Sequence, residues 1–273
     1  MNAFLCSTCG TEYPASPKPP LSCLICSEER QYIGLQGQSW TTLHELRESH
    51  ANEFHPREPN LTAIRTEPAF AINQRAFLVE TAAGNILWDC IALLDDATIQ
   101  KIRERGGLRA IAISHPHYYT TVADWSRAFG DVPVYVHAAD RQWVVSSDER
   151  LWFWEGEQLK LHDDITVIRC GGHFEGGAVL HWPAGANGKG VLLSGDIIQV
   201  VPDRRWVSFM YSYPNYIPLG AAAIHRILAA LAPFEFDRVY GAFHPMDLIE
   251  DGKAAIHRSA DRYLRAIAGE LPG

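Results

Sequence analysis

The sequence predicts an α/β or α+β fold in which helices lie outside packed β-sheets. Two observations carry this prediction. Apolar strand-like runs such as "LRAIAIS" (108–114) and "GVLLSGD" (190–196) alternate with helical patterns such as "LGAAAIHRILAALAPF" (219–234). Turn residues such as Ala83-Gly84-Asn85 separate short strand-like runs in the first half, as in hairpins. With 273 residues, the chain is long enough to bury a full core.

The expected elements follow in chain order after a polar stretch with a short helical pattern, "TTLHELRESHANEF" (41–54). Expected strands cover 61–67, 69–73, 76–81, 85–90, 108–114, 132–137, 165–170, 177–183, 190–196 and 236–244. Expected helices cover 95–107, 122–130, 137–145, 219–234 and 253–271. Three domains follow from composition: a cysteine-bearing module at 1–35, a linker at 36–60 and the main domain at 61–273.

Composition excludes several classes of partner. The net charge is −8 and no run of Lys or Arg occurs, so we expect no nucleic-acid partner. The most apolar run, "GVLLSGDIIQVV", is interrupted by Asp196 and is too short to span a membrane. The N-terminus lacks the pattern of a secretory signal, so we expect a cytoplasmic protein. The partner that we expect is a small-molecule substrate.

Four of the six cysteines form two pairs, Cys6 with Cys9 and Cys23 with Cys26. This C-x2-C…C-x2-C spacing brings four thiolates within tetrahedral reach of one ion. A module this small also needs a bound metal ion to stabilise its fold, because it cannot bury enough apolar surface by itself. The pairs resemble a zinc ribbon, and more distantly the rubredoxin-like modules that hold iron. Leu24 and Ser27 depart from the rubredoxin pattern, which favours structural zinc over iron.

A second group of metal-ligating residues lies at the ends of strand-like runs. His115 and His117 follow "LRAIAIS", and His173 follows two glycines in "VIRCGGHFEGG". Asp196 ends "VLLSGD", and His244 ends "RVYGAFH". Imidazole and carboxylate groups in this arrangement predict a metal site.

In these landmarks the chain resembles the metallo-β-lactamase superfamily. The resemblance implies a four-layer αββα sandwich with the metal site at one edge. It implies that His115, His117 and His173 hold the first metal and that Asp196 is a further ligand. His244 corresponds to a ligand of the second metal.

The resemblance also implies that the second metal site is degraded. Two-metal members take Asp and His ligands from the positions that Tyr119 and Thr120 occupy here. Tyr and Thr are poor zinc ligands because both are protonated at neutral pH, with a Tyr pKa of about 10. One site with three imidazoles and a carboxylate therefore remains, suited to one zinc ion, although iron or manganese also fits such ligands.

The expected activity is hydrolysis of an ester, lactone, thioester or related bond by a metal-activated water. Asp196 is the expected base and His244 the expected general acid, with Tyr119 as a hydrogen-bond donor to an oxyanion.

Two other functions fit the same residues. A mono-iron dioxygenase of the persulfide-dioxygenase type would use the histidines and the carboxylate around Fe(II). A non-catalytic binding or regulatory module would also show the loss of Asp and His from the first motif.

The aromatic stretch after Asp196 is the expected substrate wall, with Trp206, Tyr211, Tyr213 and Arg205 as its contacts. The alternative is a loop that packs on the sheet or forms the contact of a homodimer.

Overall fold

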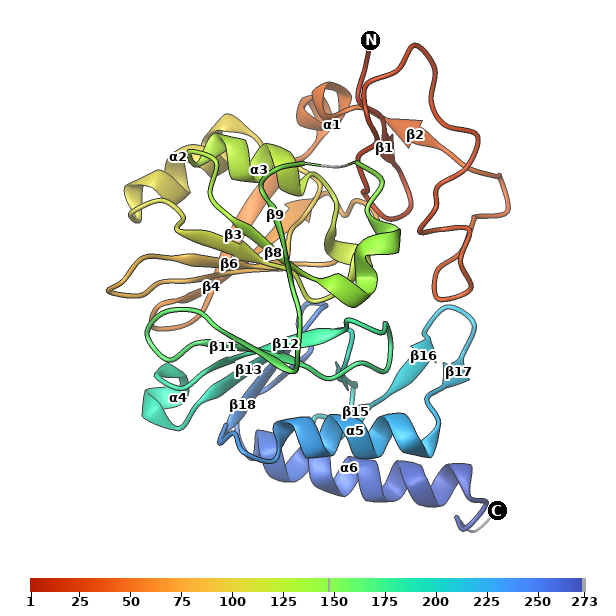
Figure 1. The fold of residues 1–273 in the computed structure, drawn as a ribbon, viewed down its shortest axis with the longest axis vertical. Coiled ribbons are helices and arrows are strands. Elements are labelled where there is room, and N and C mark those ends of the chain that lie inside the picture. Colours follow the sequence, from red (N-terminus) through yellow and green to blue (C-terminus); the bar gives the residue numbers. More distant parts are fainter. Residues whose placement is uncertain (147, 272–273) are drawn as a thin grey trace. The chain divides into compact units, whose positions relative to one another are not determined.

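The computed structural model describes residues 1–146 and 148–271 and divides into two compact units, Met1–Trp154 and Glu155–Gly273 (Figure 1). Each unit is built around one large β-sheet with helices packed on it. The longest helix has 16 residues. None of the helices in residues 1–146 and 148–271 has both the length and the apolar character needed to cross a bilayer.

The first unit contains a seven-stranded sheet in the order β3-β4-β5-β6-β7-β8-β9. Its strands are β3 (Ala51–Glu58), β4 (Leu61–Glu67), β5 (Ala76–Val79), β6 (Ile86–Trp88), β7 (Ala110–Ala112), β8 (Val134–His137) and β9 (Leu151–Trp154). Strands β3 to β6 pair antiparallel, as hairpins do, and β6 to β9 pair parallel. Helices α2 (Asp96–Glu104) and α3 (Val122–Ala128) form the first two crossovers of the parallel half and lie side by side in Figure 1.

The parallel pairing of β6 with β7 brings two strand ends to the same edge of the sheet. Trp88 lies opposite Ala112, so Asp89 and the segment after Ala112 leave the sheet together. Asp89 has a φ of 62°, and its main-chain N–H donates to the carbonyl of Ala112 at 2.8 Å. This edge carries His115 and His117.

The cysteine segment is part of the first unit. Strand β1 (Leu5–Cys6) pairs antiparallel with β2 (Trp40–Thr41), which leads into helix α1 (Leu43–Ser49). Thr42 and Glu45 form a capping box at the start of α1. Leu5 is fully buried in a cluster with Leu46, Ala92 and Leu93. The cysteine segment is therefore anchored in the apolar core of this unit as well as by its own sulfur atoms.

The structure differs from the sequence-based expectations in three stretches of the first unit. Within the expected linker, residues 51–58 form β3, which is stabilised by its long pairing with β4. Residues 69–73, expected as a strand, form a turn because Ala71 and Asn73 adopt positive φ. The expected helix at 137–145 is the 3-10 helix η2 (Ala138–Trp143), whose first turn is capped by the ring of His137.

The second unit contains a six-stranded sheet in the order β10-β11-β12-β13-β18-β19. Its strands are β10 (Gln158–Lys160), β11 (Thr166–Arg169), β12 (Ala178–Trp182), β13 (Val191–Gly195), β18 (Arg238–Gly241) and β19 (Asp247–Leu248). Between β13 and β18 lie β14 (Gln199–Val200), β15 (Val207–Ser208), β16 (Met210–Ser212) and β17 (Ile217–Pro218). The single turn α4 (Gly185–Gly188) precedes β13.

Helices α5 (Ala221–Leu231) and α6 (Gly252–Ile267) pack together and cover one face of this sheet (Figure 1). Their apolar faces are buried against strand side chains such as Val179, Leu192 and Val239. Helical spacing puts Ile224, Ile227 and Leu231 of α5 on this face.

The core of the second unit gives a stability prediction. Ile227 is fully buried, so Ile227→Ala should leave a cavity and lower the free energy of unfolding by about 2–5 kcal/mol. His225, on the exposed side of the same helix, provides the control, and His225→Ala should change stability by less than about 0.5 kcal/mol. Urea unfolding of both variants measures this, and equal effects would contradict the buried face assigned to α5.

Candidate metal centres

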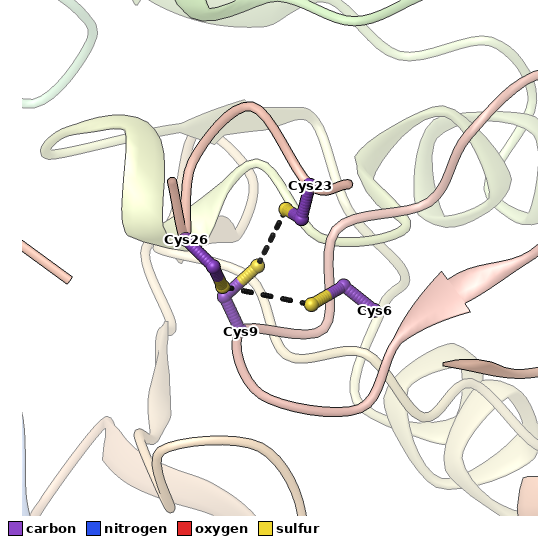
Figure 2. Close-up of side chains that lie close together, drawn as sticks. All are labelled: Cys6, Cys9, Cys23 and Cys26. Atoms are coloured by element: carbon purple, nitrogen blue, oxygen red, sulfur yellow. Dashed lines mark hydrogen bonds between the residues drawn. The ribbon is translucent and has the colours of Figure 1, made fainter. Parts of the chain in front are cut away.

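The four paired cysteines form one cluster, and their side chains face one another (Figure 2). The Sγ atoms of Cys6 and Cys26 lie 3.6 Å apart, and those of Cys9 and Cys23 also lie 3.6 Å apart. All four sulfur atoms lie within 4.8 Å of one another, and all four side chains are buried. Gly10, with a φ of 81°, lets the chain turn after Cys9, and its N–H donates to the carbonyl of Cys6.

These distances fit a tetrahedral metal site. Zinc–sulfur bonds of about 2.3 Å place tetrahedral sulfur atoms about 3.8 Å apart. A disulfide needs a separation of about 2.05 Å, and all six cysteines are free thiols. Four buried sulfur donors are the set that structural zinc and rubredoxin-type iron prefer, so the cluster fits the predicted metal.

The thiols of the cluster have unequal acidity. Hydrogen bonds from Cys23 and Cys26 lower the pKa of Cys6, whereas burial raises the pKa of Cys9. A hydrogen bond from Cys26 lowers the pKa of Cys23 to about 7. A cation bound by the four sulfur atoms would favour the thiolate form of each cysteine.

His115 and His117 lie on the segment that follows β7. Both are buried, with 1% and 2% of their surface exposed, and their ring centroids lie 4.9 Å apart. The carboxylate of Asp89 accepts a hydrogen bond of 2.7 Å from the N–H of Ser114. The hydroxyl of Ser114 lies 2.8 Å from Nδ1 of His115, which leaves Nε2 of that ring as the metal-binding atom.

Tyr119 and Thr120 follow directly but do not supply metal ligands. The hydroxyl of Tyr119 donates to the carbonyl of Asp140 at 3.3 Å, and burial raises its pKa well above the usual value. The hydroxyl of Tyr119 has only one proton, and this proton already lies in the hydrogen bond to Asp140. This arrangement opposes the expected role of Tyr119 as a hydrogen-bond donor to an oxyanion. Thr120 accepts a hydrogen bond through its carbonyl from the N–H of Glu12.

His173 and Asp196 lie in the second unit. Gly171 and Gly172 have positive φ and turn the chain after β11, so that the buried ring of His173 reaches the carbonyl of Tyr211. That carbonyl lies 2.8 Å from Nδ1 of His173, which again leaves Nε2 as the metal-binding atom. Asp196 follows β13 directly and is buried, with 3% of its surface exposed.

The remaining residues of the predicted site have different surroundings. The ring of Tyr213 lies 5.5 Å from that of His173, and its hydroxyl donates to the main-chain carbonyl of Asp196 at 2.9 Å. Arg205 is exposed and pairs with Asp203 at 2.7 Å, and Trp206 lies under the guanidinium of Arg262. Tyr211 and Tyr213 thus adjoin His173, whereas Arg205 and Trp206 have other partners. His244 follows β18 and is half-buried.

Two groups of buried metal-ligating side chains are therefore present in the described residues. One group is Cys6, Cys9, Cys23 and Cys26 of the first unit. The other consists of His115 and His117, which are buried in the first unit, and of His173 and Asp196, which are buried in the second. The sequence predicted both groups. It did not point to Asp89, Ser114 or the carbonyl of Tyr211, because these supporting groups follow no motif. The one available signal was Asp89 at the end of the strand "NILWDC".

The hydroxyl of Ser114 provides a prediction for the histidine group. Ser114→Ala should lower the affinity for the metal about 10- to 100-fold, because the ring of His115 loses the partner that orients it. Competition with a chelator of known affinity measures this. Ser126→Ala, which removes a buried hydroxyl bonded to the carbonyl of Val132, is the control. A loss of equal size in that variant would mean that Ser114 acts only through stability.

One relative matches this chain over nearly its whole length. The Bacillus subtilis (strain 168) protein named "Uncharacterized protein YmaE" is 48% identical over 273 residues, which cover 99% of each chain. The chain belongs to the YmaE family. No protein-family model matches the sequence.

Solved structures show that the fold is that of the metallo-β-lactamases. The metallo-β-lactamase FIM-1 from Pseudomonas aeruginosa, in its mono-zinc form, aligns with a TM-score of 0.57 and 17% identity over 81% of this chain and 97% of its own. The metallo-β-lactamase DIM-1 aligns with a TM-score of 0.58 and 15% identity over 79% and 98%. A B3 metallo-β-lactamase with an active-site glutamic acid aligns with a TM-score of 0.51 and 18% identity over 82% and 90%. At these identities the similarity establishes the fold alone.

Proposed function

We propose that this member of the YmaE family is a metal-dependent hydrolase that cleaves an ester, lactone, thioester or related bond. Its reaction centre would be one metal ion held by His115, His117, His173 and Asp196. The observation that carries the proposal is this donor set, three imidazoles and one carboxylate, all of them buried in a chain with the metallo-β-lactamase fold.

The donor set suits zinc, and iron or manganese as alternatives. When bound, such an ion polarises a substrate carbonyl and lowers the pKa of a water molecule to about 7. Ser114 and the carbonyl of Tyr211 orient the rings of His115 and His173, so that both present Nε2. The missing ligands at Tyr119 and Thr120 support a single ion rather than two.

Proton transfer is assigned to Asp196 and His244. The carboxylate of Asp196 is proposed to take a proton from the attacking water, and the ring of His244 to donate one to the leaving group. The phenol of Tyr213 supports Asp196 from its main-chain side. Burial, followed by the nearby charge of Asp196, raises the pKa of Tyr213, so this phenol stays a hydrogen-bond donor at neutral pH.

A substrate would contact Tyr211 and Tyr213 first, because these two residues adjoin His173. Arg205 and Trp206 remain proposed contacts only if a substrate displaces Asp203 or Arg262 from them. The aromatic rings favour an apolar or ring-bearing substrate.

The proposal is tested by a hydrolysis screen of the full chain, purified without chelators. The panel consists of chromogenic esters, thioesters, lactones and a β-lactam, assayed before and after treatment with a chelator and after addition of Zn²⁺. We expect one bond class to be cleaved, with the activity lost on chelation and restored by the metal. Hydrolysis that is unaffected by complete metal removal would refute the proposal. Iron in the histidine group together with oxygen consumption would replace it with the dioxygenase function.

A further inference from the structure

The side chain of Gln74 connects the two metal-ligating segments of the first unit. Its amide nitrogen donates to the carbonyl of Cys9 at 3.3 Å and to the carbonyl of His117 at 3.4 Å. Cys9 belongs to the cysteine cluster and His117 to the histidine group. The amide carries two N–H donors, so one buried side chain can serve both carbonyls.

A second contact joins the same two segments. The N–H of Glu12, three residues after Cys9, donates to the carbonyl of Thr120 at 3.1 Å. Thr120 has a φ of 27°, which is unfavourable for a β-branched residue and needs such a partner to persist. The chain that carries the first cysteine pair therefore holds a strained position next to the histidine motif.

Gly10 packs so closely against Ala92 and Thr120 that a larger side chain does not fit at this position. A Cβ atom added to Gly10 would lie 2.9 Å from Cβ of Ala92 and 3.5 Å from Cγ2 of Thr120. Within the cysteine segment, the N–H of Cys6 donates to the carbonyl of Thr11, and Sγ of Cys9 lies 3.2 Å from the hydroxyl oxygen of Thr11. The turn from Cys6 to Glu12 is therefore held by contacts within the cysteine cluster and by contacts with the segment that bears His115 and His117.

We propose that Gln74 is a positioning residue that couples the cysteine cluster to the loop bearing His115 and His117. A metal bound by the four thiolates fixes the turn from Cys6 to Glu12. The turn then holds the loop through Gln74 and through the Glu12–Thr120 hydrogen bond. The inference rests on the proposed function, because it takes His115 and His117 as metal ligands. Coupling of this kind is reciprocal, so the histidine group should also affect the cysteine cluster.

Hydrogen exchange of residues 113–121 tests the mechanical part of the coupling. Gln74→Met preserves the approximate volume and removes both donors, and Gln74→Glu preserves the shape and replaces the donors with acceptors. Both variants should raise the exchange rates in this segment about tenfold, the change expected for the net loss of one or two hydrogen bonds. Gln31→Met is the matched control, because Gln31 is also buried in this unit but lies outside the Cys9–His117 bridge.

The cluster itself is tested in the same assay. Cys23→Ser combined with Cys26→Ser should also raise the exchange of residues 113–121. The same double change should add less in the Gln74→Met background than in the wild-type background, because one of the two links through which it acts is already broken. Unchanged exchange in both Gln74 variants would overturn the coupling, and so would full additivity of the two changes.

A spectroscopic readout tests the reciprocal direction. With Co²⁺ in the cysteine cluster, thiolate-to-cobalt absorption reports its release to a chelator. His115→Ala with His117→Ala should accelerate this release several-fold in the wild-type background and by a smaller factor in the Gln74→Met background, where only the Glu12–Thr120 hydrogen bond still joins the two segments. Equal acceleration in both backgrounds would contradict the assigned role of Gln74.

Failure of the proposed function would be seen differently. Metal-dependent hydrolysis would be absent, while hydrogen exchange of residues 113–121 would still respond to Gln74 and to the cysteine cluster.

Discussion

His117→Ala is expected to remove one metal ion per chain and to lower hydrolysis at least about a thousandfold. A metal ion contributes several kcal/mol to the stabilisation of transition-state charge, and each 1.36 kcal/mol corresponds to a factor of about ten in rate. His117 is buried beside His115, so no solvent-exposed side chain can replace its imidazole as a metal ligand. Steady-state kinetics on the bond class found in the screen, with elemental analysis of the same sample, measures both effects.

The control for this prediction is His225→Ala, which removes an exposed imidazole of α5. It should retain the metal content and the rate of the unmodified protein. A His117→Ala protein that loses its metal but keeps its rate would show that the hydrolysis occurs elsewhere in the chain.

Cys23→Ser combined with Cys26→Ser is expected to remove the other metal ion and to destabilise the first unit by about 4 kcal/mol or more. Structural zinc binds with about 10–16 kcal/mol in small peptides, and much of that free energy is folding free energy. The apolar anchoring of Leu5 keeps part of this unit folded without the metal. At about 2–4 °C per kcal/mol, the melting temperature should fall by about 10 °C or more.

Ser22→Ala is the matched control, because Ser22 precedes Cys23 and is exposed. It should leave both the metal content and the melting temperature unchanged. If the double cysteine variant melts at the same temperature as the control, the cluster is not a structural metal site.

The ligands of both groups could be predicted from the sequence because each ligand belongs to a short local pattern. The cysteines of each pair are separated by two residues, a spacing typical of metal-binding turns, and His115 and His117 follow an apolar strand. The glycines before His173 mark a sharp turn in any fold. The alternation of strands and helices likewise predicted layered sheets, and the solved metallo-β-lactamases confirm the fold.

The supporting contacts could not be predicted, because they join residues that are far apart in the chain. Gln74 is 65 residues from Cys9 and 43 from His117, and Asp89 is 25 residues from Ser114. Such pairs depend on the register of β6 with β7 and on the docking of the cysteine turn. Strand β3 was also missed, because its residues form a strand only when paired with β4 along its whole length.

The loss of the second set of ligands has a physical account in the structure. Tyr119 is buried with its hydroxyl on the carbonyl of Asp140, and Thr120 is held by Glu12. Both residues thus contribute to the packing of the histidine loop.

The central claim is that the chain has two separate metal sites, and metal content per chain tests it most directly. The samples are the unmodified protein, His117→Ala and the Cys23→Ser, Cys26→Ser variant, all purified without chelators and measured by elemental analysis. The account predicts two metal ions per unmodified chain and one in each variant. One ion per unmodified chain that persists in His117→Ala would mean that the histidine group binds no metal, and the hydrolase function would then be wrong.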